Sequence, residues 1–253
     1  MDANAYLARL GISPDEVAPT REFLNRLQYA HVTRVPYENL DILDGIPLSL
    51  DADALFDKIV TRGRGGYCFE VNGALAALLT SLGFPVKSYL ARFWRGMEKT
   101  PMRRHRVLVV TAEDGEYLMD VGIGQSAPRY PLAMHPGEVQ EQLGETYRLY
   151  RHPTWGIMVE DLHKGAWRDF YSFTEETTDE IDFVMPSFWC EKHPDSPFHK
   201  DLMLAIKTEK GRLAVNGRDY KEFEGDELIY MEENVSDGRL RVLLLEKFGI
   251  LRP

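Results

Sequence analysis

The residues in this sequence best able to perform chemistry are one cysteine, one histidine and one aspartate. Cys68 follows the glycine-rich loop RGRGG (62–66) and falls in the first turn of a predicted helix. Unpaired N–H groups and the helix dipole favour an anion there, so we predict a lowered thiol pKa and a nucleophilic thiolate. The same N–H groups are suited to an oxyanion. A lone cysteine can also have a buried structural role, so the surrounding residues must decide whether Cys68 is catalytic or structural.

His105 and Asp120 fall on two strand-like segments joined by residues 112–115. Their pairing register decides whether the two side chains meet. A two-residue turn would place Asp120 opposite Val109, about 13 Å along the strand from His105. A four-residue loop places Asp120 opposite Val107 and diagonal to His105, with about 7–8 Å between the Cα atoms. We predict the longer loop and a His–Asp pair that orients the imidazole for the cysteine.

The elements that must position these residues divide the chain into three predicted segments of an α+β protein. Residues 1–83 carry apolar residues at helical spacing behind the capping residues Ser13, Thr20 and Asp51, and the last helix begins near Cys68. Residues 84–188 contain β-branched and aromatic runs typical of an antiparallel sheet or small barrel. Residues 189–253 combine a proline-rich loop, two strand-like segments and a terminal helix that ends before a glycine.

Composition excludes several functional classes. With 253 residues, 44% of them hydrophobic, the chain can bury a core, and a net charge of −10 argues against a nucleic-acid partner. Two cysteines cannot build a disulfide framework, and the first residues lack a signal-peptide pattern, so we expect a cytoplasmic protein. No apolar run is long enough to cross a membrane. The seven histidines and two cysteines show no metal-ligand spacing, so we predict no metal.

Four motifs in order and spacing resemble the arylamine N-acetyltransferase family of the bacterial type. They are VPYENL (35–40), RGGYCFEVN (64–72), His105 and DVGIG (120–124). The likeness covers residues 1–135 clearly and extends more loosely to SPF (196–198). It implies a catalytic triad of Cys68, His105 and Asp120, and a cysteine-protease-like core. In that core an N-terminal helical bundle and a central antiparallel β-barrel carry the triad, and a C-terminal α/β lid closes the site.

The resemblance also implies an activity: N-acetylation of arylamines and arylhydrazines, as in xenobiotic metabolism, and O-acetylation of N-hydroxyarylamines. Acetyl-coenzyme A would be a co-substrate, with no bound cofactor; oligomeric state is not indicated. The residues that it places in the amine pocket are Tyr37, Phe69, Ile123 and Phe198. Family members usually carry phenylalanine at position 37 and an aromatic residue at position 123, so this chain differs from them in its pocket.

Basic residues between positions 92 and 106 are suited to the phosphates of coenzyme A, and the alternative is a solvated basic loop. The predicted contacts are Arg92, Arg95, Lys99 and Gly124. We also predict that Glu38 and Arg64 pair to hold the loops around the cysteine, and that Cys190 is buried and inert.

Three other functions remain open on the sequence. An amide synthase of the same fold would close a macrolactam and would need a wide channel. A cysteine hydrolase of the papain or transglutaminase kind uses the same triad order but lacks the RGGYCFE context, and a non-catalytic binding protein would not need the triad. A dinucleotide fingerprint at residues 122–127 is excluded, because Pro128 and Pro131 forbid the helix that it requires.

Overall fold

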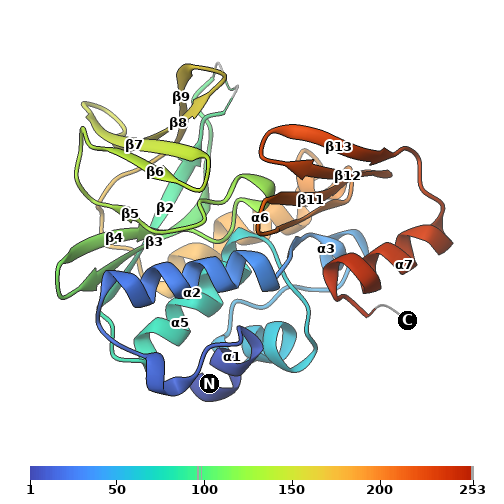
Figure 1. Ribbon diagram of the computed structural model, residues 1–253, viewed down its shortest axis with the longest axis horizontal. Helices are drawn as coiled ribbons and strands as arrows, with labels where there is room; N and C mark the ends of the chain where they lie inside the picture. The colour runs from blue at the N-terminus through green and yellow to red at the C-terminus, as the bar shows by residue number, and fades with distance from the viewer. Residues whose placement is uncertain (96, 98, 252–253) are drawn as a thin grey trace.

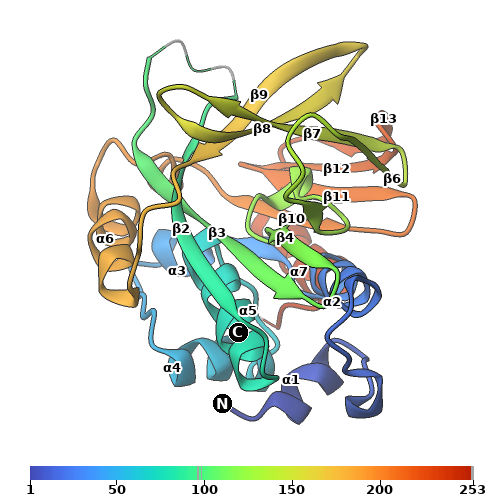
Figure 2. The ribbon, with the colours of Figure 1, turned by 90° about the vertical axis from the view of Figure 1, so that its left-hand side faces the viewer.

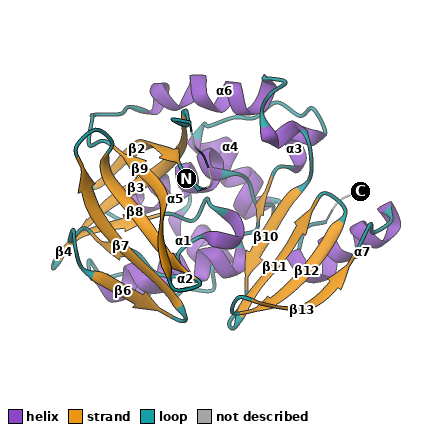
Figure 3. Cartoon of the chain, turned by 90° about the horizontal axis from the view of Figure 1, so that it is seen from above, coloured by secondary structure: helices purple, strands orange, loops and turns teal. Residues whose placement is uncertain are grey.

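The computed structural model describes residues 1–95, 97 and 99–251. Two antiparallel sheets and a group of helices form the α+β fold that the sequence predicts (Figure 1). Seen from above, the two sheets stand side by side with N-terminal helices between them (Figure 3). This arrangement brings segments from all three predicted parts of the chain to one central region.

The first part of the chain is helical, as predicted. Its helices are α1 (Ala3–Arg9), α2 (Arg21–Arg34), α3 (Leu40–Leu43), α4 (Ala52–Phe56) and α5 (Cys68–Ser81). Predicted capping residues are confirmed: Ser13 forms a capping box, and the Thr20 and Asp51 side chains accept hydrogen bonds from the first turns of α2 and α4. Helix α5 ends before Gly83, whose φ of +87° suits glycine. Most of α5 is buried, so its start is held firmly in the core.

An eight-stranded antiparallel sheet follows and curls into the predicted barrel (Figure 2). Its strands run in the order β5-β4-β3-β2-β9-β8-β7-β6. Their bounds are β2 (Val86–Phe93), β3 (Arg103–Ala112), β4 (Gly115–Met119), β5 (Leu132–Ala133), β6 (Val139–Gln142), β7 (Glu145–His152), β8 (Gly156–His163) and β9 (Ala166–Phe173). Aromatic and β-branched side chains fill the interior.

Two glutamine side chains join the edge strands β5 and β6. The Gln140 carboxamide accepts from the Ala133 N–H at 2.7 Å and donates to the Ala133 carbonyl at 2.9 Å. Gln142 does the same with the N–H and carbonyl of Tyr130, at 2.8 and 3.0 Å. Both glutamines are buried. Each carboxamide therefore imitates a neighbouring strand and satisfies backbone groups at an open sheet edge.

Removing one of these carboxamides should weaken the barrel. Gln140→Ala leaves the buried N–H and carbonyl of Ala133 without their partner, so we expect the free energy of unfolding to fall by about 2 kcal/mol in urea titrations. Glu141→Ala is the matched control, because that side chain is exposed on the same strand. Equal stability of the two variants would show that the carboxamide does not hold the edges together.

The last part of the chain forms a second sheet, in the order β1-β10-β11-β12-β13, with α7 against it. The bounds are β1 (Tyr37–Glu38), β10 (Met203–Lys207), β11 (Gly211–Asn216), β12 (Asp219–Glu224), β13 (Glu227–Glu232) and α7 (Asp237–Phe248). Strand β1 comes from the helical segment, so the first and last parts of the chain share a sheet. Among the described residues, no helix combines the length and apolarity needed to cross a membrane.

Helix α6 (Val184–Lys192) corrects the prediction of an irregular start to the last segment. Its proline, Pro186, falls in the first turn, where the missing N–H has no intrahelical partner to lose. The β12–β13 hairpin was also not predicted. Its strands are largely polar and exposed at β13, so they lack the alternation of a half-buried strand.

Candidate active site

Cys68 begins helix α5, as predicted, and is 3% exposed. The preceding turn is fixed by Glu70, whose carboxylate accepts a hydrogen bond from the Tyr67 N–H at 3.1 Å. This is the carboxylate half of a capping box, and it satisfies one of the N–H groups at the start of the helix. The Cys68 thiol donates a weak hydrogen bond to the Arg104 carbonyl at 3.8 Å, which ties the helix start to strand β3.

The β3–β4 hairpin has the predicted register, but the predicted four-residue loop is wrong, because Ala112 pairs with Gly115 and the turn consists of Glu113 and Asp114 alone. Thr111 pairs with Glu116 and Leu108 with Met119, so Asp120 continues the ladder to a position opposite Val107. The predicted contact is confirmed, since His105 Nε2 lies 2.6 Å from Asp120 Oδ2. Both side chains are buried. The other ring nitrogen of the histidine is left for the nucleophile.

Asn72 is a functional residue that the sequence analysis missed. Its Nδ2 donates to Asp120 Oδ1 at 2.9 Å and to the Arg106 carbonyl at 2.7 Å, and its Oδ1 accepts from the Val121 N–H at 3.0 Å. Residue 72 follows Cys68 by four positions and therefore shares its face of α5. That spacing was the signal that could have identified it. Asn72 fixes the carboxylate relative to the cysteine.

Gly122 allows the hairpin and the helix to approach each other closely. A Cβ at this position would lie 2.7 Å from the Cys68 Cα, which no side chain permits. The Gly122 N–H donates a second hydrogen bond to Asp120 Oδ1, at 2.8 Å. The glycine of the DVGIG motif therefore has a steric role beside the nucleophile.

The predicted low pKa of the Cys68 thiol is not supported. Burial raises the pKa of Cys68 well above its usual value, and the nearby Cys190 and Asp120 raise it further. The Arg106 N–H and the Arg104 charge oppose this rise only in part. The helix N-terminus thus does not suffice to ionise the thiol, and its proton must pass to an acceptor inside the site.

Cys68 and His105 line one cavity of about 250 Å³ between the barrel and the second sheet. Three of the predicted pocket residues, Tyr37, Ile123 and Phe198, line the same cavity, and so does Gly124. The fourth, Phe69, does not line it. Its side chain is fully buried on another face of α5, where it packs against Tyr67 and Phe183. Successive helix positions differ by about 100° in direction, so Phe69 turns away from the cavity.

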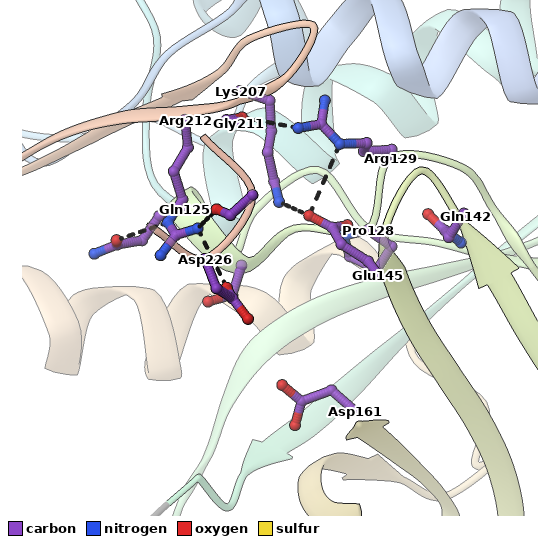
Figure 4. Close-up of polar contacts among 12 residues, drawn as sticks. Gln125, Pro128, Arg129, Gln142, Glu145, Asp161, Lys207, Gly211, Arg212 and Asp226 are labelled. Carbon is purple, nitrogen blue, oxygen red and sulfur yellow. Dashed lines mark hydrogen bonds and ion pairs between the residues drawn. The ribbon is translucent and has the colours of Figure 1, made fainter. Parts of the chain in front are cut away.

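A second, polar cavity of about 320 Å³ adjoins the first, and Gln125 lines both. Its walls carry ion pairs from the barrel and the second sheet (Figure 4). Lys207 pairs with Glu145, and Arg212 lies 3.6 Å from Asp226. Arg95 also lines this cavity, but its guanidinium is bound to Asp161 at 2.7 Å.

The other predicted coenzyme A contacts lie elsewhere. The Arg92 guanidinium donates to the Pro101 carbonyl and stacks 5.3 Å from the centre of the Trp155 ring. Lys99 is exposed, and neither residue lines either cavity. Arg92 and Arg95 thus contact different parts of the barrel.

The predicted Glu38–Arg64 pair is confirmed and belongs to a larger buried network. Arg64 Nη2 lies 2.8 Å from Glu38 Oε1 and 2.8 Å from Asp41 Oδ1. Lys58, which the sequence analysis did not single out, lies 2.7 Å from Asp41 Oδ2 and 2.7 Å from Glu70 Oε1. Glu70 in turn caps α5. The network links the VPYENL segment to the turn that presents the cysteine.

Comparisons with known proteins agree with this site. A family model described as N-acetyltransferase matches residues 20–251. An arylamine N-acetyltransferase of Mycolicibacterium smegmatis is 38% identical over 86% of this chain and 81% of its own. One of Salmonella typhimurium, named arylamine N-acetyltransferase / N-hydroxyarylamine O-acetyltransferase, is 34% identical over 98% and 88%.

Solved structures extend the likeness to the whole fold. The arylamine N-acetyltransferase of Mycobacterium marinum in complex with CoA has a TM-score of 0.92 at 32% identity, over 98% of this chain and 93% of that one. Sequence, fold and the Cys68–His105–Asp120 arrangement thus lead to the same conclusion. The chain belongs to the arylamine N-acetyltransferase family and is an acyltransferase.

Proposed function

We propose that this enzyme takes an acetyl group from acetyl-coenzyme A onto Cys68 and passes it to an aromatic amine or hydrazine, or to the oxygen of an N-hydroxyarylamine. The observation that carries the proposal is the placement of Cys68 and a carboxylate-held His105 on one cavity. The names of the relatives and the CoA complex of one of them support the donor and the acceptors.

The first half of the reaction loads the cysteine. His105 takes the Cys68 proton on the ring nitrogen that Asp120 does not occupy, and the thiolate attacks the acetyl carbonyl. Asp120 stabilises the imidazolium that forms. The tetrahedral intermediate then collapses, the C–S bond to coenzyme A breaks, and the imidazolium returns its proton to the leaving thiolate. Because burial opposes a free thiolate, the proton transfer and the ion pair are confined to the site.

The second half discharges the acetyl group. A neutral amine attacks the Cys68 thioester, His105 takes the proton that the nitrogen sheds, and the thiolate leaves as the amide forms. Transfer of the acetyl group from one thioester to another changes the free energy little. The main requirement on the protein is therefore to keep water away from the acetyl-Cys68 intermediate. The low exposure of Cys68 serves that demand.

The size of the cavity favours this reaction over macrolactam closure. A dry cavity of about 150 Å³ accepts benzene, and the 250 Å³ beside Cys68 suits one substituted ring. For the donor, Arg95 and Gly124 remain proposed contacts, because Gly124 lines the cavity at Cys68 and Arg95 lines the adjoining polar cavity.

Intact-protein mass spectrometry tests the proposal directly. After mixing with acetyl-coenzyme A and no amine, wild-type protein should gain the mass of one acetyl group, and Cys68→Ala should gain none. Cys190→Ala is the matched control, since it removes the other buried cysteine and should still be acetylated. An added arylamine should discharge the adduct and appear as its amide.

Two results would point to another function. Thioester hydrolysis at the same rate with and without amine would identify a cysteine hydrolase. Acetylation of Cys68→Ala would remove the proposed nucleophile.

A further inference from the structure

Tyr37 lies on strand β1, directly beside the loop that leads into the nucleophile. It forms a parallel β-bridge with Gly66, two residues before Cys68, and the Glu38 N–H donates to the Gly66 carbonyl at 3.0 Å. On its other side Tyr37 pairs with Ala205 of β10. The backbone of Tyr37 is therefore held on both sides and is fixed relative to Cys68.

The Tyr37 ring forms part of the wall of the reaction cavity, which Cys68 and His105 also line. The ring packs against Gly124, where a Cβ would lie 3.0 Å from it. It also packs against the apolar cluster that contains Cys68 and Phe198. Because close packing leaves an enclosed ring few orientations, the Tyr37 hydroxyl is held in one place inside the site.

The Tyr37 hydroxyl has no hydrogen-bond partner within residues 1–95, 97 and 99–251. Burial raises the pKa of this hydroxyl well above its usual value, and among the nearby charges that of Cys68 adds most to the rise. The hydroxyl therefore stays protonated and lies within electrostatic reach of the reacting sulfur. A buried phenol usually finds a hydrogen-bond partner. This one is free to donate to an atom of the substrate.

Two other polar side chains that line the cavity are engaged elsewhere. The Gln125 carboxamide oxygen accepts a hydrogen bond from Arg212 at 3.4 Å. The Arg104 guanidinium lies 5.8 Å from the centre of the Trp189 ring on helix α6. Neither side chain is thus as free as Tyr37 to meet a group bound at Cys68.

A backbone donor lies at the sulfur itself, in the first turn of α5. The first N–H groups of a helix have no intrahelical acceptor. Glu70 accepts from the Tyr67 N–H, but among the described residues no group accepts from the Cys68 N–H. When a thiolate attacks a thioester, negative charge develops on the carbonyl oxygen, and hydrogen-bond donors directed at that oxygen stabilise the transition state. The Cys68 N–H can supply one such donor and the Tyr37 hydroxyl another.

We propose that Tyr37 is a catalytic residue whose hydroxyl donates a hydrogen bond to the acetyl carbonyl oxygen as that oxygen becomes an oxyanion. During loading, the Cys68 sulfur bonds to the acetyl carbon and the C=O electron pair moves onto oxygen. That pair re-forms the C=O bond as the C–S bond to coenzyme A breaks. During discharge the amine nitrogen attacks the same carbon, so the same oxygen is stabilised again. The inference rests on the proposed function, because it concerns acetyl transfer through Cys68.

Tyr37→Phe removes the donor and keeps the ring. Single-turnover loading of Cys68 from acetyl-coenzyme A should slow by about 10- to 100-fold, the value of a hydrogen bond to a charged group. Discharge of acetyl-Cys68 should slow by a similar factor with every arylamine, because the stabilised oxygen is the same. Tyr171→Phe is the matched control. The Tyr171 hydroxyl is also buried without a partner, but Tyr171 does not line the cavity, so both rates should stay at the wild-type value.

Alkylation of Cys68 separates oxyanion stabilisation from an effect on the thiol. Iodoacetamide reacts by displacement of iodide at a saturated carbon and forms no oxyanion, although it requires the thiolate as acylation does. Tyr37→Phe should therefore be alkylated at Cys68 at the wild-type rate, measured by mass spectrometry of the peptide that contains this residue. Normal alkylation would also show that the variant is folded around an intact nucleophile.

Three results would overturn the proposal. Equal slowing of alkylation and acylation would assign Tyr37 to the ionisation of the Cys68 thiol. Slowing of discharge alone would assign Tyr37 to the binding of the amine, and unchanged loading and discharge would remove it from the reaction. Failure of wild-type protein to be acetylated at all would instead overturn the proposed function.

Discussion

Asp120→Asn should lower kcat by about 10³- to 10⁴-fold while leaving the fold intact, because the change forces the wrong tautomer on His105. The magnitude is that of the equivalent change in the serine-protease triad, which uses the same His–Asp logic. No other substitution outside Cys68 should cost as much activity for so small a change in shape.

The hydrogen bonds around Asp120 explain why the new amide cannot adapt. Oδ1 accepts from two donors, Asn72 Nδ2 and the Gly122 N–H, so this position must keep an oxygen. The amide NH₂ of asparagine would then occupy the position of Oδ2 and face His105 Nε2. That nitrogen would have to accept, and the proton would move to the nitrogen that should receive the Cys68 proton.

Single-turnover loading of Cys68 from acetyl-coenzyme A is the measurement, with thermal unfolding to confirm the fold. Asp114→Asn is the matched control, since Asp114 lies in the turn of the same hairpin and accepts from the Tyr117 hydroxyl, at 2.8 Å, away from His105. A variant that loads Cys68 within about tenfold of the wild-type rate would argue against the tautomer role.

Much of the site could be predicted because it depends on local sequence. The Cys68 helix follows from its glycine loop and apolar run, and the His105–Asp120 contact follows from the register of one hairpin. Both require only short-range geometry. The family motifs then added the relation between helix and hairpin, which spacing along the chain cannot provide.

Features set by packing between distant segments could not be predicted in this way. The thiol pKa of Cys68 depends on how deeply α5 is covered, and the helix dipole expected from the sequence is outweighed by that burial. Phe69 was assigned to the pocket by its place in a motif. Whether its side chain lines the pocket depends on its direction on α5, and that direction brings it against Tyr67 instead. The sequence also could not show that the Arg95 guanidinium pairs with Asp161 on β8, 66 residues later.

Lys58 is a charged residue whose role likewise could not be predicted from the sequence. A lone lysine near the end of a short helix is typical of a solvated surface, yet this one is 4% exposed and bound by two carboxylates. The pair Glu38–Arg64 was found because both residues lie in motifs. Lys58 lies in none, so only the tertiary structure reveals that it completes the network.

Lys58→Met should therefore lower the free energy of unfolding by about 3–5 kcal/mol, the cost of leaving a buried charge without its partner. Lys87→Met is the matched control. Its ammonium pairs with Glu116 on the surface, where an ion pair contributes about 0–1 kcal/mol. The double variant Lys58→Met/Glu70→Gln should recover part of the loss, because it also removes a carboxylate that would otherwise stay buried and unpaired.

The loss of unfolding free energy in Lys58→Met should be larger at higher pH. Burial already raises the pKa of Glu70 from 4.5 to about 7, although Lys58 opposes that rise, so removing Lys58 must raise this pKa further. A carboxyl whose pKa is higher in the folded than in the unfolded state binds more protons when folded, and stability then falls as pH rises between the two values. Urea titrations should thus show a larger deficit for Lys58→Met at pH 8 than at pH 5. A deficit that stays constant, or grows toward acid, would mean that Lys58 stabilises the fold by packing of its chain and not by its charge.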